Sequence, residues 1–152
     1  MNKSSRTNLL PKGREAVKPL FAVGHYLEKC HIEKTLQELV KIRVSQINGC
    51  AYCLDMHWKD ARALGETEQR LYGLSAWHES PYYSERERAA LQWAEAVTAF
   101  KVPDEVHAEA IKCFTEEELI DLTMAVTLIN TWNQLNIAFP KEAGTYRVGQ
   151  FG

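Results

Sequence analysis

The apolar residues of this chain recur with the 3.6-residue period of α-helices, and this periodicity constrains the fold more than any other feature. Runs of alternating β-branched residues are few, and only five of the 152 residues are prolines, so strands have little support. The pattern predicts seven helices, at residues 14–29, 32–48, 50–65, 68–77, 84–100, 103–114 and 115–139. We therefore expect an all-α fold, a helical bundle.

Capping residues support several of these helix starts. Thr67 is a typical N-cap, and Ser84 with Glu87 and Thr115 with Glu118 have the spacing of capping boxes, in which each side chain satisfies a free backbone amide. The chain length suits one domain with a sizeable core. We therefore expect a single domain over residues 1–152, with residues 1–12 flexible and residues 141–152 forming a C-terminal tail that is loose or docked.

Composition excludes several classes of partner. The net charge of −2 gives no basic footprint for nucleic acid, and no apolar run suits a membrane span or a secretory leader. We expect a cytoplasmic protein, and a disulfide framework is not expected in that compartment. The four cysteines therefore need another explanation. Cys30 and Cys113 stand alone, which is typical of small buried apolar residues.

The remaining two cysteines form a CxxC motif that the periodicity places at the N-terminus of a helix. In a helix that starts at the first cysteine, one face carries Cys50, Cys53, Leu54, His57 and Ala61. The free amides and partial positive charge of a helix N-terminus favour thiolate over thiol. The sequence therefore predicts two reactive sulfurs beside an imidazole.

This arrangement suits peroxide chemistry. A thiolate that attacks a peroxide oxygen becomes a sulfenic acid, and a second thiol nearby converts that acid to a disulfide before it oxidises further. A general acid beside the sulfur speeds the step by protonating the leaving oxygen. His57 is placed to do so, and Glu38 on the preceding helix is placed to face the cysteines.

Each part of the motif also has a simpler interpretation. Alone, His57 is more often a core histidine and Glu38 a solvated charge. Zinc needs four ligands at a structural site, and Cys50, Cys53 and His57 supply three, so zinc requires Glu38 as the fourth. Leu54 stands where haem attachment requires histidine, and the helical periodicity does not fit a thioredoxin-like site.

Together, Glu38, the sequence Cys50-Ala-Tyr-Cys53 and His57 resemble the AhpD alkylhydroperoxidase core of the carboxymuconolactone decarboxylase-like family. The resemblance continues through residues 39–65, Trp77, residues 84–98 and residues 130–136. It implies an all-α fold assembled into homo-oligomers, and an alkyl hydroperoxidase that binds no cofactor or metal. It also implies recharging by an external dithiol, such as a lipoyl-type thiol carrier.

The resemblance also implies a role for each motif residue. Cys53 corresponds to the peroxidatic sulfur, and Cys50 to the more exposed resolving partner that meets the reductant. His57 and Glu38 correspond to the proton relay.

The chain departs from the family pattern at two positions. Tyr52 stands where the best-known members have histidine, and Gln134 stands where relatives often have arginine. Two other functions remain as alternatives: a lactone decarboxylase, found in family members that lack the cysteine pair, and a non-enzymatic zinc or redox-sensing module.

Overall fold

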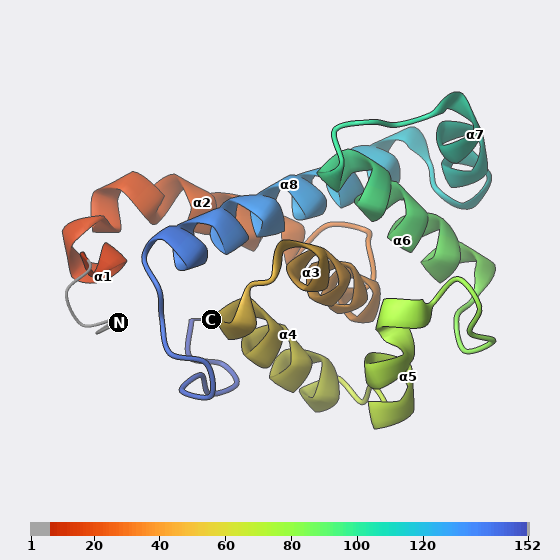
Figure 1. Ribbon diagram of the computed structural model, residues 1–152. Helices are drawn as coiled ribbons and strands as arrows, with labels where there is room; N and C mark the ends of the chain where they lie inside the picture. Colours follow the sequence, from red (N-terminus) through yellow and green to blue (C-terminus); the bar gives the residue numbers. More distant parts are fainter. Residues whose placement is uncertain (1–6, 152) are drawn as a thin grey trace.

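Helix α3 lies at the centre of the computed structural model, which describes residues 7–151, and it packs against α4, α6 and α8. Figure 1 shows the long helix α8 crossing one side of the molecule, with α2 beside it. The helices are α1 (Leu9–Lys12), α2 (Arg14–Leu27), α3 (Lys34–Asn48), α4 (Ala51–Ala63), α5 (Glu68–Tyr72), the 3-10 helix η2 (Gly73–Ala76), α6 (Glu85–Thr98), α7 (Asp104–Cys113) and α8 (Glu116–Ala138). The described residues contain no strand, so the predicted all-α, single-domain fold is confirmed.

The predicted number of helices is wrong in two places. The expected helix at residues 68–77 is split into α5 and η2. It tightens at Gly73, where the ring of Tyr82 lies 3.4 Å from the position that a β-carbon would take. The additional helix α1 lies in a segment that was expected to be flexible, and Asn8 caps it by accepting a hydrogen bond from the Leu10 amide. Residues 1–6 of that segment lie outside the described residues.

The predicted caps are confirmed. Thr67 accepts a hydrogen bond from a backbone amide of α5, and Ser84 with Glu87 and Thr115 with Glu118 form complete capping boxes at α6 and α8. These interactions are made within four residues of the chain, so their sequence pattern is sufficient to locate the helix starts.

Two buried clusters hold the helices together, and α3 contributes to both. Leu36, Val40 and Val44 pack into a cluster with residues of α6, α7 and α8, whereas Leu39 and Ile42 pack toward α4, α5 and η2. Burying one such side chain contributes about 1.5–3 kcal/mol. Because α3 is packed on two sides, it is a rigid support for the functional residues that it carries.

A tight turn joins α3 to α4 and places the cysteine pair. Gly49 ends α3 in the left-handed conformation, with φ of 70°, which costs a glycine little. The Asn48 side chain donates hydrogen bonds to Asn130 and Asn133 of α8. The turn is therefore fixed to α8, and Cys50 follows it as the N-cap of α4.

The C-terminal tail, residues 141–151, is docked against α4. Tyr146 is buried, and its hydroxyl donates a 2.8 Å hydrogen bond to Asp60 of α4. Lys59 of α4 donates to the backbone oxygens of Gly144 and Tyr146. Figure 1 shows the chain descending from the end of α8 to the start of α4. The tail was expected to be either loose or docked, and the structure shows it docked.

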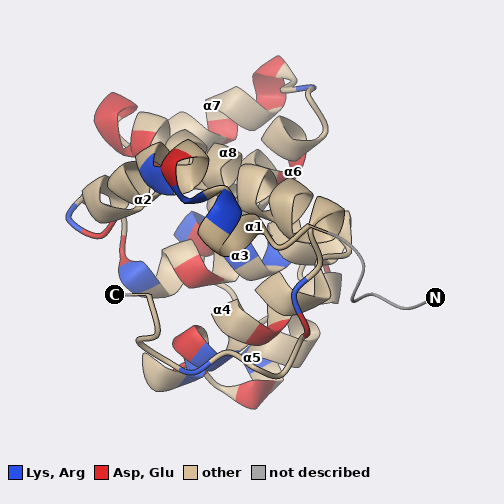
Figure 2. Cartoon of the chain, turned by 90° about the vertical axis from the view of Figure 1, so that its left-hand side faces the viewer, with Lys and Arg blue, Asp and Glu red and all other residues tan. Residues whose placement is uncertain are grey.

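Figure 2 shows Lys and Arg residues interspersed with Asp and Glu residues along the helices, in keeping with the net charge of −2. None of the helices in residues 7–151 combines the length and apolarity that crossing a membrane requires.

Candidate active site

Cys50 and Cys53 form a disulfide at the N-terminus of α4, with their Cα atoms 5.3 Å apart. The Cys50 sulfur also accepts the backbone N–H of Cys53 at 3.4 Å, as an N-cap side chain does. The predicted position of the pair at a helix start is therefore confirmed. The first turn of α4 provides the free amides that favour a thiolate when the pair is reduced.

Exposure does not separate the two sulfurs as the sequence analysis expected. Cys50 is 2% exposed and Cys53 is 1% exposed, so both are buried. Cys53 lines a cavity that opens to solvent, and Cys50 is not among the residues of its wall. Both cysteines are packed in the core cluster that α3 shares with α6 and α8, but only Cys53 also borders the cavity. A small molecule in the cavity therefore meets Cys53.

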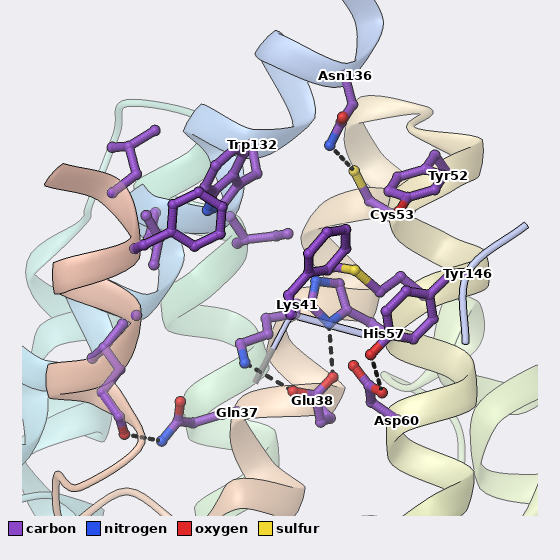
Figure 3. Close-up of a pocket in the computed structure, with 18 of the residues that line it drawn as sticks. Gln37, Glu38, Lys41, Tyr52, Cys53, His57, Asp60, Trp132, Asn136 and Tyr146 are labelled. Carbon is purple, nitrogen blue, oxygen red and sulfur yellow. Dashed lines mark hydrogen bonds and ion pairs between the residues drawn. The ribbon is translucent and has the colours of Figure 1, made fainter. Parts of the chain in front are cut away.

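The cavity beside Cys53 has a volume of about 430 Å³, within the range of pockets that hold small molecules. Its wall comes from α1, α2, α3, α4, α8 and the C-terminal tail. Most of its surface is apolar, and the rings of Phe21 and Trp132 lie with their centroids 5.2 Å apart on one side. Figure 3 shows Trp132 and Tyr52 on opposite sides of this space.

A buried ion pair lies one helical turn beyond Cys53. His57 Nδ1 is 2.8 Å from Glu38 Oε2, and Lys41 Nζ is 2.8 Å from Glu38 Oε1. His57 and Glu38 are each 7% exposed. Figure 3 shows the imidazole between the Cys53 region and the Glu38 carboxylate. The structure thus brings together all four residues that the sequence analysis singled out.

The surroundings of Glu38 keep it ionised. Burial raises the pKa of Glu38, but the charges and hydrogen bonds of His57 and Lys41 outweigh burial and lower that pKa to about 2. An ionised carboxylate accepts the proton that His57 carries on Nδ1. The Nε2 atom is then the imidazole position left to exchange a proton with another group, and the ring orientation is fixed.

Asp60 and Tyr146 extend this polar network, and neither is part of the motif predicted from the sequence. Burial raises the pKa of Asp60, and the hydrogen bond from Tyr146 partly opposes that effect. Burial and the bond to Asp60 raise the pKa of Tyr146. Asp60 could have been identified from the sequence, because it follows His57 by three residues and so lies on the same helix face. No local pattern identifies Tyr146, because its contact depends on the docking of the tail.

One group of three possible metal ligands occurs among residues 7–151. The donor atoms of Glu38, His57 and Asp60 lie within 4.8 Å of one another. Lys41 already bonds Glu38, however, and Tyr146 already bonds Asp60. The zinc set considered from the sequence required both cysteine sulfurs, which are joined to each other here. In the disulfide form, Glu38, His57 and Asp60 are therefore engaged in hydrogen bonds with other side chains.

Asn136 of α8 is a third residue that the motif did not identify. Its Nδ2 donates to Cys53 Sγ at 3.5 Å, and Figure 3 shows this amide directed at the sulfur.

Tyr52 and Gln134, the two departures from the family pattern, lie in different surroundings. Tyr52 lines the cavity, where burial and then the charge of Asp55 raise its pKa. Gln134 is exposed and is not part of the cavity wall.

Comparison with known proteins gives consistent results. Residues 14–96 match the carboxymuconolactone decarboxylase family. The uncharacterized protein YdfG of Bacillus subtilis is 41% identical over 145 residues, which are 93% of this chain and 99% of that protein. The crystal structure of ATU0492 from Agrobacterium tumefaciens has a TM-score of 0.88 at 38% identity, over 93% of this chain and 99% of that one. ATU0492 is a protein of unknown function for which a role as antioxidant defence protein AhpD has been suggested.

A more distant structure shares the fold. The alkylhydroperoxidase AhpD core protein from Ralstonia eutropha JMP134, an uncharacterized peroxidase-related protein, has a TM-score of 0.77 at 18% identity, over 87% of this chain and 72% of that one. The match over more than half of the chain, and the identity to YdfG along nearly its whole length, place the chain in a family. This protein belongs to the AhpD-like, carboxymuconolactone decarboxylase family.

Proposed function

We propose that this protein is a thiol-dependent peroxidase that reduces alkyl hydroperoxides through a cycle of Cys50 and Cys53 between dithiol and disulfide. One observation carries the proposal. Cys53 belongs to a disulfide and lines a mostly apolar cavity, one helical turn from the buried pair of His57 and Glu38. A redox-active sulfur, a proton carrier and space for an organic molecule are thus in one place.

The first half of the cycle oxidises Cys53. Its thiolate attacks the terminal oxygen of the hydroperoxide, so that a sulfur–oxygen bond forms and the oxygen–oxygen bond breaks. The alkoxide that leaves takes a proton from His57 and departs as an alcohol. The ion pair with Glu38 stabilises the charged imidazole before that transfer. Cys53 becomes a sulfenic acid.

The second half restores the reduced enzyme. The Cys50 sulfur attacks Cys53, the disulfide forms and the sulfenic oxygen leaves as water. An external dithiol, such as a lipoyl-type carrier, then attacks the disulfide through a mixed disulfide and leaves in its own oxidised, cyclic form. The sum is one hydroperoxide and one dithiol converted to one alcohol, one water and one disulfide. Because Cys53 faces the cavity, the reductant enters by the same route as the peroxide.

The two alternative functions have less support. A lactone decarboxylase of this family does not need a cysteine pair, and it leaves the placement of the disulfide at the cavity without a role. A zinc module needs both sulfurs free for the metal, and here they are bonded to each other. A redox-sensing module is compatible with the disulfide, but it leaves the cavity beside Cys53 without a role. Metal analysis of the reduced, dialysed protein distinguishes the zinc module, because stoichiometric zinc would support it and contradict the peroxidase.

Homo-oligomeric assembly is part of the proposal. Several large apolar side chains are exposed around α7 and the start of α8, which supports a contact with another copy. The exposed fractions are 95% for Phe100, 41% for Val102, 51% for Ile111 and 64% for Ile120. Light scattering during size-exclusion chromatography tests the expectation, and a monomer at all concentrations would contradict it.

Steady-state turnover tests the proposed activity. The assay follows oxidation of dihydrolipoamide by the enzyme in the presence of cumene hydroperoxide. We expect the wild type and a Cys30→Ala control to turn over, and Cys53→Ser to lose all activity above the rate without enzyme. Equal rates for Cys53→Ser and the wild type would refute the proposal.

A further inference from the structure

Lys141 is a cation in the cavity wall that has no carboxylate partner among the described residues. It is half-buried, and its Nζ atom lies 5.1 Å from the centre of the Tyr52 ring and 4.9 Å from that of Phe151. No carboxylate oxygen of residues 7–151 lies within 4.0 Å of that atom. Lys41, which also lines the cavity, is by contrast paired with Glu38.

A half-buried ammonium group without a counter-ion loses hydration that protein contacts have to replace. Burial lowers the pKa of Lys141 accordingly. The two aromatic rings replace part of the lost hydration through cation–π interaction. An anion in the cavity would replace more, because a charge-assisted hydrogen bond is about twice as strong as a neutral one.

The carboxylates of the cavity wall have partners other than Lys141, so they do not compete with an incoming anion for this lysine. Glu38 is bonded to His57 and Lys41, and Asp60 accepts the hydrogen bond of Tyr146. Glu28 is exposed and lies 3.5 Å from His25. Among residues 7–151, Lys141 is therefore the half-buried positive group of the wall that is left for a ligand.

The rest of the cavity suits an apolar body. Its wall is mostly apolar, and its volume of about 430 Å³ exceeds what a hydroperoxide of a few carbon atoms would fill. Lys141 lies at the Tyr52 side, and Trp132 lies on the opposite side (Figure 3). A ligand with its charged end at Lys141 therefore extends its apolar chain past the region of Cys53 toward Trp132.

We infer that the cavity binds an amphipathic carboxylic acid, with its carboxylate on Lys141 and its apolar chain between α2, α4 and α8. Joined to the proposed function, on which this part rests, the inference names the substrate class as hydroperoxides of apolar carboxylic acids. The reaction itself is the one described above, and the carboxylate takes no part in electron transfer.

Binding to the oxidised protein tests the inference without turnover. Isothermal titration calorimetry compares decanoic acid with decanol, which has the same chain without the charge. We expect the wild type to bind the acid about tenfold more tightly, as one charge-assisted hydrogen bond provides. Lys141→Met should bind both ligands equally, and Lys141→Arg should keep the preference.

Lys34→Met is the matched control, because Lys34 also lines the cavity but is exposed to water. It should keep the preference for the acid. Equal binding of acid and alcohol by the wild type, or an undiminished preference in Lys141→Met, would overturn the inference. Equal loss of the preference in Lys34→Met and Lys141→Met would also overturn it, since the effect would then reflect overall charge. If Lys141→Met does not fold, Lys141→Gln replaces it in the same comparison.

The two proposals fail separately. Selective binding of decanoic acid without peroxide turnover would refute the peroxidase and leave the inference standing. Turnover with equal kcat/KM for the hydroperoxide of linoleic acid and for its methyl ester would refute the substrate class and leave the peroxidase standing. Both proposals together predict a higher kcat/KM for the acid in the wild type, and no such difference in Lys141→Met.

Discussion

Replacing Asn136 by leucine should raise the pKa of the reduced Cys53 thiol. The Asn136 amide donates to Cys53 Sγ at 3.5 Å, and the same donor stabilises the thiolate once the disulfide is opened. Hydrogen bonds to charged groups contribute about 1.5–3 kcal/mol, and the long distance to sulfur places this one at the lower end. Since one pKa unit corresponds to about 1.4 kcal/mol, we expect an increase of about one unit.

The pKa is measured from the rate at which iodoacetamide alkylates Cys53 as a function of pH. A Cys50→Ser background keeps the disulfide from forming, and peptide mass analysis reports Cys53 separately from Cys30 and Cys113. Below the pKa the rate follows the thiolate fraction, so Asn136→Leu should react about tenfold more slowly there. Gln134→Leu on the same helix is the control, because Gln134 is exposed and outside the cavity wall.

The result that would refute this reasoning is a Cys53 pKa that stays within about 0.3 units of the parent in Asn136→Leu. An equal increase in Gln134→Leu would also refute it, because the effect would then come from α8 as a whole and not from the amide at the sulfur.

Other predictions follow from the same site. Cys50→Ser should form a sulfenic acid on Cys53 that dimedone traps, whereas Cys53→Ser should form none; equal trapping in both would contradict the assigned roles. His57→Gln should slow turnover by about 100-fold or more in a protein that still folds, as for a general acid, and a loss of folding would instead indicate a structural role. The folded-state pKa of Glu38 is lowered from 4.5 to about 2, so its stabilisation is present above pH 4.5 and disappears as pH falls toward 2. Urea unfolding from pH 6 to pH 2 should therefore show a steeper loss of stability in the wild type than in Glu38→Gln, and parallel curves would contradict the ion pair's contribution.

The sequence alone predicts the features that depend on neighbouring residues. Ser84 with Glu87, and Thr115 with Glu118, identify helix starts because capping is complete within one turn. The position of the cysteine pair at the start of α4 follows from the same local periodicity. The juxtaposition of His57 and Glu38 needed the family resemblance as well, since 19 residues separate them.

Features that depend on distant parts of the chain were not predictable in this way. The bond between Tyr146 and Asp60 spans 86 residues, and the contact of Asn136 with Cys53 spans 83. Both require the tail and α8 to be placed against α4 first. The burial of Cys50, which the resemblance led us to expect to be the more exposed sulfur, likewise follows from packing of the α3–α4 turn against α6 and α8.

Thiol mapping tests the proposed cycle most directly. Free thiols of the reduced protein are counted and located by mass spectrometry before and after one equivalent of cumene hydroperoxide, and again after excess dihydrolipoamide. The proposed cycle predicts the loss of two thiols as a disulfide between Cys50 and Cys53, their return on addition of the dithiol, and unchanged Cys30 and Cys113. If Cys50 and Cys53 stay reduced after the peroxide, this protein is not the peroxidase that its cavity and cysteine pair support.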